Sequence, residues 1–250
     1  MIRRLVAAGH QVQALGRTDE RCAAVAELGA TAVTSTLATA DGADVVMVCV
    51  FTDDQVRRVC IDDGLAGALP AGCVLVLHTT GSPHTAESIA EIAAHTGAAV
   101  LDAPVSGGPH DIAAGTVTLF VGGSDGALEH ARPALTSYAD PVLHVGPLGH
   151  GQKVKLVNNT LFAAQIGLLA EAVKLGDGLG LDETALLSAL PHGSGSSRAL
   201  TGIAARGSVA SFITTAGPFV SKDVAVVRQT VAELGGDLGL LDDIVAAGLR

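Results

Sequence analysis

The sequence predicts an α/β fold: a Rossmann-like, doubly wound parallel sheet followed by an all-α domain. Residues 43–51 and 72–77 are continuous aliphatic and β-branched runs, which are typical of parallel strands buried on both faces. Strand and helix patterns alternate over residues 11–145, as they do in βαβ units. After Gly151 the apolar period becomes that of a helix and the strand patterns stop. We therefore expect two domains of different class.

The two domains are expected over residues 1–147 and 148–250, the second led by a long interdomain helix. Strands in the first domain are predicted at 11–15, 31–33, 43–51, 72–77, 98–101, 117–121 and 141–145. Its helices are predicted at 1–8, 18–28, 53–60, 83–96 and 125–137, where Gly9 ends the first, Thr18 caps the second and Pro83 opens the fourth. Helices of the second domain are predicted at 151–179, 182–190, 195–206 and 218–234.

The beginning of the sequence departs from the usual order of a dinucleotide-binding fold. Such folds open with a strand, a G-x-G-x-x-G turn and a helix. This sequence has the end of a helix and the next strand, but it lacks the first strand and the glycine turn. The missing strand is central in the strand order 3-2-1-4-5-6, so its neighbours would flank an unpaired slot. We expect a truncated gene product or a misassigned start, which the upstream sequence read in frame tests.

Composition and charge exclude several classes of function. Hydrophobic residues make up 48% of the chain, charged residues 16%, and the formal net charge is −10. Because nucleic-acid binding depends on neutralising phosphates, we expect no nucleic-acid partner. No apolar run reaches the roughly 18 residues of a membrane span, and the first residues lack the apolar core of a signal peptide. The four cysteines lack metal-ligand spacing, so we expect reduced thiols, a cytoplasmic protein and no metal site.

Arg17 and Thr18 follow the strand at 11–15, where a dinucleotide-binding fold contacts the adenine ribose. No carboxylate stands at the strand end to accept the ribose hydroxyls. Arg17, helped by Thr18, can instead hold a 2′-phosphate, so we predict NADP as the cofactor, with NAD as the alternative. An arginine at a helix start is also a common surface residue, and that interpretation stays open.

The segment His78–Pro83 follows the buried strand at 72–77, at an edge where ligands bind in open α/β sheets. Its hydroxyl groups, Thr80 among them, and the N–H groups of the following helix can contact a nicotinamide amide or a substrate carboxylate. A capping turn with proline at the first helical position explains the same residues without a ligand.

The segment Asp102–Gly108 also follows a strand and ends in Ser106, Gly107 and Gly108. The glycines let backbone N–H groups approach a ligand closely, and Ser106 adds a hydroxyl. This combination suits a small carboxylate substrate, although a tight loop that needs glycine has the same composition.

Lys155 and Asn159 lie four residues apart in the predicted interdomain helix and therefore share one helical face. Lysine can release and retake a proton, so a Lys155 in a pocket is a candidate general acid/base. Asn159 can both donate and accept hydrogen bonds to a hydroxyl or carboxylate. Lys222 can supply a second cation from the C-terminal domain. A surface lysine at position 155 and a surface ion pair at 222–223 are the alternatives.

These motifs together resemble the β-hydroxyacid dehydrogenase family, which includes 3-hydroxyisobutyrate dehydrogenase and tartronate semialdehyde reductase. Residues 8–18 are similar to its A-G-H-x-V…N-R-T segment, with Gly16 at the asparagine. Residues 102–108 resemble its substrate motif D-x-x-x-S-G-G, and residues 115–123 match the family segment next in order. Residues 149–159 resemble G-x-G-x-x-x-K-x-x-N-N, and residues 219–223 resemble F-x-x-K-D. The resemblance covers nearly the whole chain.

The resemblance implies an NAD(P)-dependent oxidoreductase that interconverts a short 3-hydroxy acid and its semialdehyde. Lys155 would be the general acid/base and Asn159 would orient it or the substrate. The substrate carboxylate would bind at Ser106, Gly107 and Gly108 with help from Thr80. The cofactor would contact Arg17, Thr18, Thr80, Phe219 and Lys222. The family also implies a homodimer or homotetramer with the all-α domain at the interface. The C-terminus is expected to be shortened by roughly one or two helical turns or more.

Two other functions fit parts of the sequence. The shortened start favours a non-catalytic remnant that acts as a dimerising module. The same architecture also occurs in imine reductases, but these typically place another residue at the position of Lys155, so the retained lysine argues against that interpretation. Binding of NADPH distinguishes the enzyme from the remnant.

Overall fold

The computed structural model describes residues 1–248, and at residues 216, 218, 219, 247 and 248 it describes the backbone only. The chain divides into two compact units, Met1–Lys155 and Leu156–Arg250. The division falls inside the long helix α7 (His150–Gly178). The boundary expected at residue 147 lies just before this helix, after strand β8 (Ala139–Gly146).

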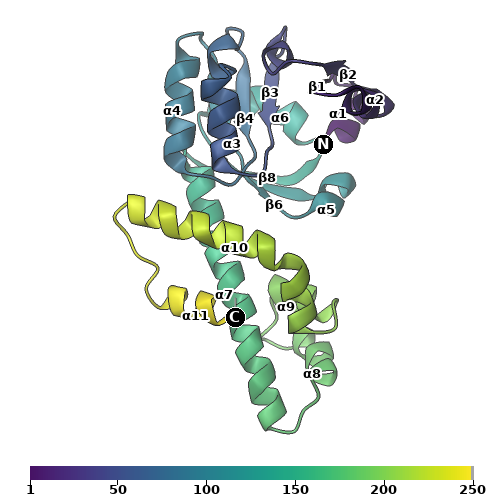
Figure 1. Ribbon diagram of the computed structural model, residues 1–250, viewed down its shortest axis with the longest axis vertical. Helices are drawn as coiled ribbons and strands as arrows, with labels where there is room; N and C mark the ends of the chain where they lie inside the picture. Colours follow the sequence, from purple (N-terminus) through teal and green to yellow (C-terminus); the bar gives the residue numbers. More distant parts are fainter. Residues whose placement is uncertain (249–250) are drawn as a thin grey trace. The chain divides into compact units, whose positions relative to one another are not determined.

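The first unit is an α/β sandwich (Figure 1), and the predicted fold class is confirmed. Its strands are β1 (Gln13–Leu15), β2 (Thr31–Val33), β3 (Val45–Val48), β4 (Val74–Leu77), β5 (Ala99–Asp102), β6 (Val105–Ser106), β7 (Val117–Gly122) and β8. Its helices are α1 (Ile2–Ala7), α2 (Asp19–Glu27), α3 (Asp53–Arg57), α4 (Pro83–Ala94), α5 (Pro109–Ala114) and α6 (Asp125–Leu135).

Side-chain caps begin the helices where the sequence predicts them. Thr18 accepts a hydrogen bond from the Arg21 N–H group at 3.2 Å and starts α2. Ser82 accepts from the His84 N–H group at 3.3 Å, and Pro83 is the first residue of α4. Such caps satisfy backbone donors that a helix leaves unpaired in its first turn.

The strands form two separate sheets. Strands β1 and β2 pair with each other in parallel, and the larger sheet has the order β3-β4-β5-β7-β6, with β8 beside β7. Strands β3, β4 and β5 are parallel, which agrees with the prediction. Among the described residues, β1 and β3 therefore belong to different sheets. This agrees with the expectation that the strands at 11–15 and 43–51 are not direct neighbours.

Strand β7 runs antiparallel to both β5 and β6, so the expectation of parallel strands throughout residues 11–145 is wrong at this point. Parallel neighbours need a crossover of roughly a dozen or more residues, usually with a substantial helix. The connection here contains the short strand β6 and the six-residue helix α5, neither of which the sequence analysis predicted. Strand β8 pairs with β7 in parallel because α6 supplies a full crossover.

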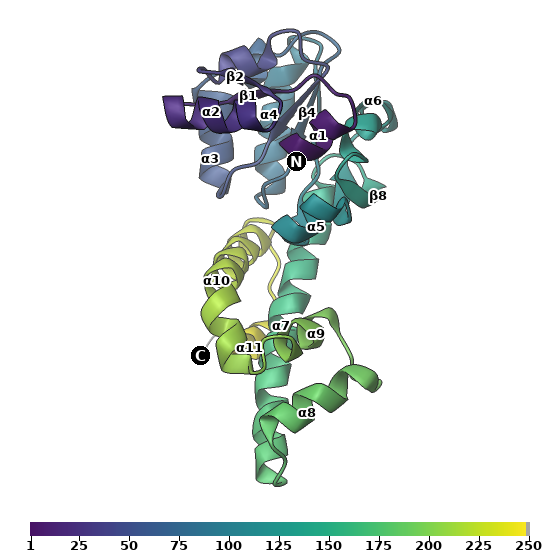
Figure 2. The same ribbon diagram turned by 90° about the vertical axis from the view of Figure 1, so that its right-hand side faces the viewer.

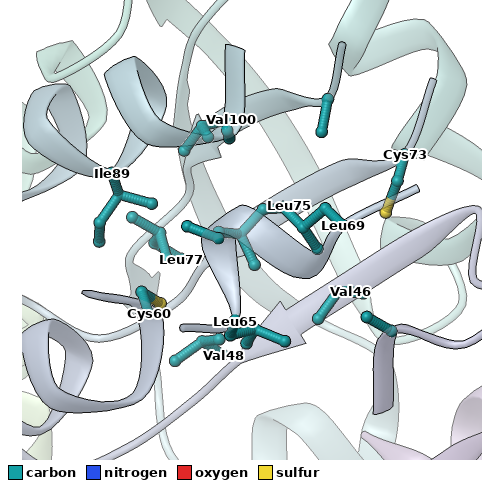
Figure 3. Packing of buried hydrophobic residues seen from close by; sticks show 14 of the residues in the cluster. Val46, Val48, Cys60, Leu65, Leu69, Cys73, Leu75, Leu77, Ile89 and Val100 are labelled. Atoms are coloured by element: carbon teal, nitrogen blue, oxygen red, sulfur yellow. The ribbon is translucent and has the colours of Figure 1, made fainter. Parts of the chain in front are cut away.

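Strand β4 is buried on both faces and separates two hydrophobic cores. Leu75 and Leu77 point into a core with α4, where Ile89 is fully buried (Figure 3). Val74 and Val76 point into the opposite core with α6 and Tyr138. The alternation follows from the two-residue period of a strand, and helices on both sides make the sheet doubly wound. The two layers leave the carboxyl ends of the strands available for a ligand site.

The second unit is all-α, and its helices α8 (Glu183–Ala189), α9 (Arg198–Ala204), α10 (Val209–Glu233) and α11 (Leu240–Gly248) pack beside α7 (Figure 2). The expected start of a helix at Pro218 is wrong: α10 begins at Val209 and continues through Pro218. Ser208 caps it by accepting from the Ser211 N–H group at 3.1 Å, and this cap is the signal that the sequence analysis missed. Helix α11 was also not predicted.

Helix α7 is long and apolar enough to cross a membrane by length and composition, with a mean hydropathy of 1.3 over its most apolar window. In the structure 44% of that window is buried. Core helices pass the same test, so the absence of a membrane span stays a prediction.

Candidate active site

The first turn of α7 is capped by a carboxylate from a distant strand. Asp102 is the last residue of β5 and is fully buried. Its Oδ1 accepts a hydrogen bond from the Gly149 N–H group at 2.7 Å, and its Oδ2 accepts from the Gln152 N–H group at 2.6 Å. The first N–H groups of a helix have no partner within the helix. Asp102 therefore caps the N-terminus of α7, a role that a side chain at the N-cap position normally has.

The charge of Asp102 is affected by opposing influences. Burial raises the pKa of the Asp102 carboxyl to about 6, while hydrogen bonds from Gln152 and Gly149 and the charge of His150 lower it. The N-terminus of a helix also favours an anion. At neutral pH, which lies above this pKa, the ionised form that accepts both hydrogen bonds predominates.

Gln152 connects the same turn of α7 to the loop after β4. Its Oε1 accepts from the Gly81 N–H group at 2.9 Å, and its Nε2 donates to the Thr79 carbonyl at 2.8 Å. Gln152 is buried, as are Thr79 and Thr80. Both amide atoms are thus used to hold the loop that contains Thr80.

Two glycines allow α7 to approach the sheet closely. A Cβ atom on Gly151 would lie 2.8 Å from the Asp102 Oδ2 atom, and a Cβ atom on Gly122 would lie 2.8 Å from the Gly151 N atom. Any larger residue at either position would push α7 away from Asp102. Close packing of α7 against the sheet therefore explains Gly151 without a ligand.

Lys155 follows Gln152 by three residues on α7 and is 8% exposed. The alternative of a solvated surface lysine does not describe this side chain. Gln152 and Lys155 share one helical face, because residues three apart are neighbours on a helix. The turn that Asp102 and Gln152 hold thus leads directly into the turn that carries the lysine.

In the second unit, Asn159 and Lys222 share a partner. The Asn159 Nδ2 atom donates to Asp223 Oδ2 at 2.9 Å, and the Lys222 Nζ atom lies 3.1 Å from Asp223 Oδ1. Asn159 is 8% exposed. Asp223 therefore orients the side chains of both Asn159 and Lys222. The side chain of Phe219, a predicted cofactor contact, lies outside the described residues.

The Ser106–Gly108 segment leads into α5. Ser106 lies in β6, Gly107 has a φ of +137°, and Gly108 caps α5. The Gly108 N–H group donates to Asp111 Oδ2 at 2.6 Å. A ligand carboxylate that uses this N–H group must displace the Asp111 carboxylate, and the two negative charges repel each other.

The residues expected at the adenine end of a nicotinamide cofactor lie at the carboxyl end of β1. Arg17 and Thr18 are exposed there, although the Thr18 hydroxyl already caps α2. Gly16 is needed for packing, since a Cβ atom on it would lie 2.8 Å from the Cys22 Sγ atom. The exposed guanidinium fits a ribose phosphate, whereas the sequence contains no G-x-G-x-x-G for the pyrophosphate.

Sequence reasoning did not assign roles to Asp102, Asp111, Gln152 and Asp223. Asp102 stood within a quoted motif, at the end of a predicted strand, without a function. Gln152 had a weak signal, namely a polar residue in the first turn of an otherwise apolar helix. Their partners lie 50 and 71 positions away in the chain, so periodicity could not reveal them.

Family models match both parts of the chain. The NAD binding domain of 6-phosphogluconate dehydrogenase matches residues 1–146. The model described as NAD-binding of NADP-dependent 3-hydroxyisobutyrate dehydrogenase matches residues 149–245.

Known proteins are similar over most of the chain. A 3-hydroxyisobutyrate dehydrogenase of Pseudomonas aeruginosa is 35% identical over 201 residues, which are 80% of this chain and 67% of that protein. An NAD-dependent L-serine dehydrogenase of the same organism has the same identity and coverage. The solved Mycobacterium tuberculosis 3-hydroxyisobutyrate dehydrogenase with L-serine is 28% identical, with a TM-score of 0.85 over 98% of this chain and 86% of that one.

Proposed function

Because this chain belongs to the β-hydroxyacid dehydrogenase family, we propose that it interconverts a short 3-hydroxy acid and its semialdehyde with a nicotinamide cofactor. One observation carries the proposal. Lys155 is buried on the helix whose first turn is hydrogen-bonded to the loop after β4 and to Asp102, the last residue of β5. These strand ends are where an open α/β sheet binds its ligands.

The substrate class follows from chemistry that the named relatives share. 3-Hydroxyisobutyrate and L-serine are both carboxylates with a primary alcohol on the β-carbon. We place the carboxylate at Ser106 and Gly107, with the Gly108 N–H group available only after Asp111 moves. Thr80 supports the ligand from the loop after β4. Two substrates that differ by one methylene group differ by only about 10–200-fold in kcat/KM in an apolar pocket. Several short hydroxy acids are therefore expected to react.

Lys155 transfers the proton of the reacting hydroxyl group. When bound, the cofactor accepts or donates the hydride at the carbinol carbon. In oxidation the Lys155 amine takes the hydroxyl proton, and in reduction the ammonium returns it to the carbonyl oxygen. Burial excludes water from competing for this proton. Asn159, one turn further on the same helix, is proposed to orient the lysine or the substrate.

We propose NADP as the preferred cofactor, with NAD as the alternative. Arg17 is the exposed cation at the end of β1, the position that contacts a 2′-phosphate in this type of fold. Asp19 and Glu20 stand in the first turn of α2 and weaken the preference by repelling the phosphate. Lys222 and Phe219 are proposed cofactor contacts on the basis of the family motif.

We also propose that the protein is a homodimer or homotetramer in the cytoplasm. Helix α7 exposes Leu161, Leu168 and Leu175, which are 52%, 54% and 66% exposed. Their spacing of seven residues places them along one face of the helix. Exposed leucines in a row are typical of a surface that another subunit covers. The cysteines described in the structure are unpaired, as expected in a reducing compartment.

Replacement of Lys155 tests the catalytic proposal. Wild-type protein, Lys155→Ala and Lys153→Ala are assayed with 3-hydroxyisobutyrate and L-serine and with NAD⁺ and NADP⁺. Lys155→Ala is expected to lower kcat about 10²–10⁴-fold, the usual contribution of a general acid/base, while cofactor affinity measured by fluorescence changes little. Lys153, exposed on the same helix, is the control and should retain activity. A Lys155→Ala variant with nearly full turnover contradicts the acid/base role, and absence of cofactor binding by the wild-type chain contradicts the proposal as a whole.

A further inference from the structure

The hydrogen bonds at the start of α7 form one connected group, which we call the α7 anchor: Thr79, Gly81, Asp102, Gly149 and Gln152. The longest of its four bonds is 2.9 Å, and it joins the Gly81 N–H group to Gln152. The acceptor and donor side chains are deeply buried, with Asp102 at 0% and Gln152 at 3% exposure. Buried polar groups with complete partners hold their neighbours in a single arrangement.

The anchor continues beyond the helix into the sheet. The Thr79 hydroxyl donates to the Val50 carbonyl at 2.8 Å and accepts from the Val50 N–H group at 2.9 Å. Thr79 thus connects the chain after β3 with the chain after β4. Gln152 connects the latter with α7, and Asp102 connects α7 with β5. Three adjacent strand ends and one helix are therefore joined by side chains that are not part of any local cap.

A structural role alone would not require this arrangement. Any serine, threonine or aspartate at the N-cap position can cap a helix locally, as Ser82 and Ser124 do for α4 and α6. At α7 the N-cap position is occupied by glycine, and the capping group comes from β5, 47 residues earlier. The first turn of α7 is consequently held by the strand ends that carry the proposed ligand loops.

We propose that Asp102 and Gln152 are positioning residues, which act on the reaction by fixing the turn of α7 that carries Lys155 relative to the ligand loops after β4 and β5. The inference rests on the proposed role of Lys155. A catalytic group that moves by about 1 Å can lose 10²-fold in rate, so small shifts of this helix are sufficient. Gly151 and Gly122 support the same function because they permit the close approach of α7 to Asp102.

A double-mutant cycle with Lys155 separates positioning from simple destabilisation. Asp102→Asn keeps the shape of the side chain but presents an NH₂ group to a backbone donor. Gln152→Met keeps the approximate volume and removes both hydrogen bonds. Each variant is expected to lower kcat about 10–100-fold with little change in cofactor Kd. In a Lys155→Ala background, neither is expected to lower the residual kcat further, because the group that they position is already absent.

Asp182→Asn is the matched control, since Asp182 caps α8 by accepting from the Ala185 N–H group at 3.0 Å. This control should keep the wild-type kcat in both backgrounds. The inference is overturned if Asp102→Asn and Gln152→Met leave kcat unchanged, or if their effects multiply with that of Lys155→Ala. If Lys155→Ala itself keeps full turnover, the proposed function fails instead.

Hydrogen exchange gives a readout that is independent of activity. In Asp102→Asn, the amide groups of residues 149–155 are expected to exchange faster than in the wild type, whereas those of α6 keep their rates. Equal protection of residues 149–155 in both proteins overturns the anchor, whatever the enzyme assays show.

Discussion

The His78 ring and the Tyr138 hydroxyl form a buried hydrogen bond of 2.7 Å between the Nε2 and oxygen atoms. The His78 Nδ1 atom lies 2.7 Å from the Ala103 carbonyl, so Nδ1 carries the hydrogen and Nε2 accepts from Tyr138. Both residues are almost completely buried. The pair joins the chain after β4 to the residue just before β8.

Tyr138→Phe is expected to destabilise the first unit. The substitution keeps the ring but leaves the buried His78 Nε2 atom without a donor, which costs about 1–3 kcal/mol. Unfolding in urea measures the loss. Thr136→Val, which removes an exposed hydroxyl, is the control and should change stability by less than about 0.5 kcal/mol. A Tyr138→Phe protein as stable as the control contradicts this role of the pair.

His78 and Asp102 are expected to affect the pH dependence of stability in opposite directions. Burial lowers the pKa of His78 from 6.5 to about 4. Between these pH values the unfolded chain binds a proton at His78 that the folded chain does not, so the free energy of unfolding falls as pH falls from 6.5 to 4. Burial raises the pKa of Asp102 from 3.8 to about 6, so its contribution to stability rises as pH falls from 6 toward 3.8. Each pKa shift changes the free energy of unfolding by about 3 kcal/mol once the pH has crossed its whole window, and the two changes oppose each other between pH 6 and 4.

Asp102→Asn removes one of the two opposing contributions. The free energy of unfolding of this variant is expected to fall more steeply between pH 6 and 4 than that of the wild type, because His78 is then unopposed. Denaturant unfolding at pH 7, 6, 5 and 4 gives the two slopes. His95→Asn, which changes an exposed histidine, is the control. Parallel curves for Asp102→Asn and wild type would show that the Asp102 pKa is not raised.

Asp111→Asn is expected to improve binding of a short carboxylate substrate. The Asp111 carboxylate occupies the Gly108 N–H group and repels an incoming carboxylate, whereas asparagine removes the charge. A gain of about 1 kcal/mol corresponds to a KM roughly five times lower, with kcat little changed. Steady-state kinetics with 3-hydroxyisobutyrate measure the change. Asp125→Asn alters an exposed carboxylate and serves as the control. An unchanged or higher KM argues against carboxylate binding at Gly108.

Arg17→Ala is expected to weaken NADP binding more than NAD binding. A charge-assisted contact to the 2′-phosphate contributes about 1.5–3 kcal/mol, which corresponds to roughly 10–100-fold in Kd for NADP. Fluorescence titration with both cofactors gives the ratio of affinities. Arg58→Ala, at another exposed arginine of the first unit, controls for the general loss of positive charge. An equal loss of affinity for NADP and NAD would show that Arg17 does not contact the 2′-phosphate.

Leu168→Glu and Leu175→Glu are expected to dissociate the proposed oligomer. A charge in an apolar interface is desolvated without a partner, which costs several kcal/mol. Light scattering after size-exclusion chromatography measures the mass of each variant. Lys174→Ala, at an exposed position of the same helix, should keep the wild-type mass. If the wild type is a monomer and sediments with lipid vesicles, the exposed leucines serve a membrane surface instead.

The sequence predicted the main features of both units for identifiable reasons. Local caps such as Thr18 and the Ser82–Pro83 pair are recognised from neighbouring residues, and buried runs such as residues 72–77 need only a two-residue period. Pro218 was misleading as a helix start because the true start depends on the Ser208 cap, ten positions before the predicted start at 218. The reversal of β7 was missed because strand direction depends on the connection and not on the strand.

By itself, the sequence predicted which residues carry chemistry. The residue types and the spacing of Lys155, Asn159 and Ser106–Gly108 can be read from the sequence, and they match family motifs in the same order. Only the tertiary structure decided how they are held. Asp102 and Gln152 find their partners across many residues, Asp111 takes the Gly108 N–H group, and Asp223 joins Asn159 to Lys222. Hydrogen bonds depend on distance and direction in space, and these exist only after the strands and helices have packed.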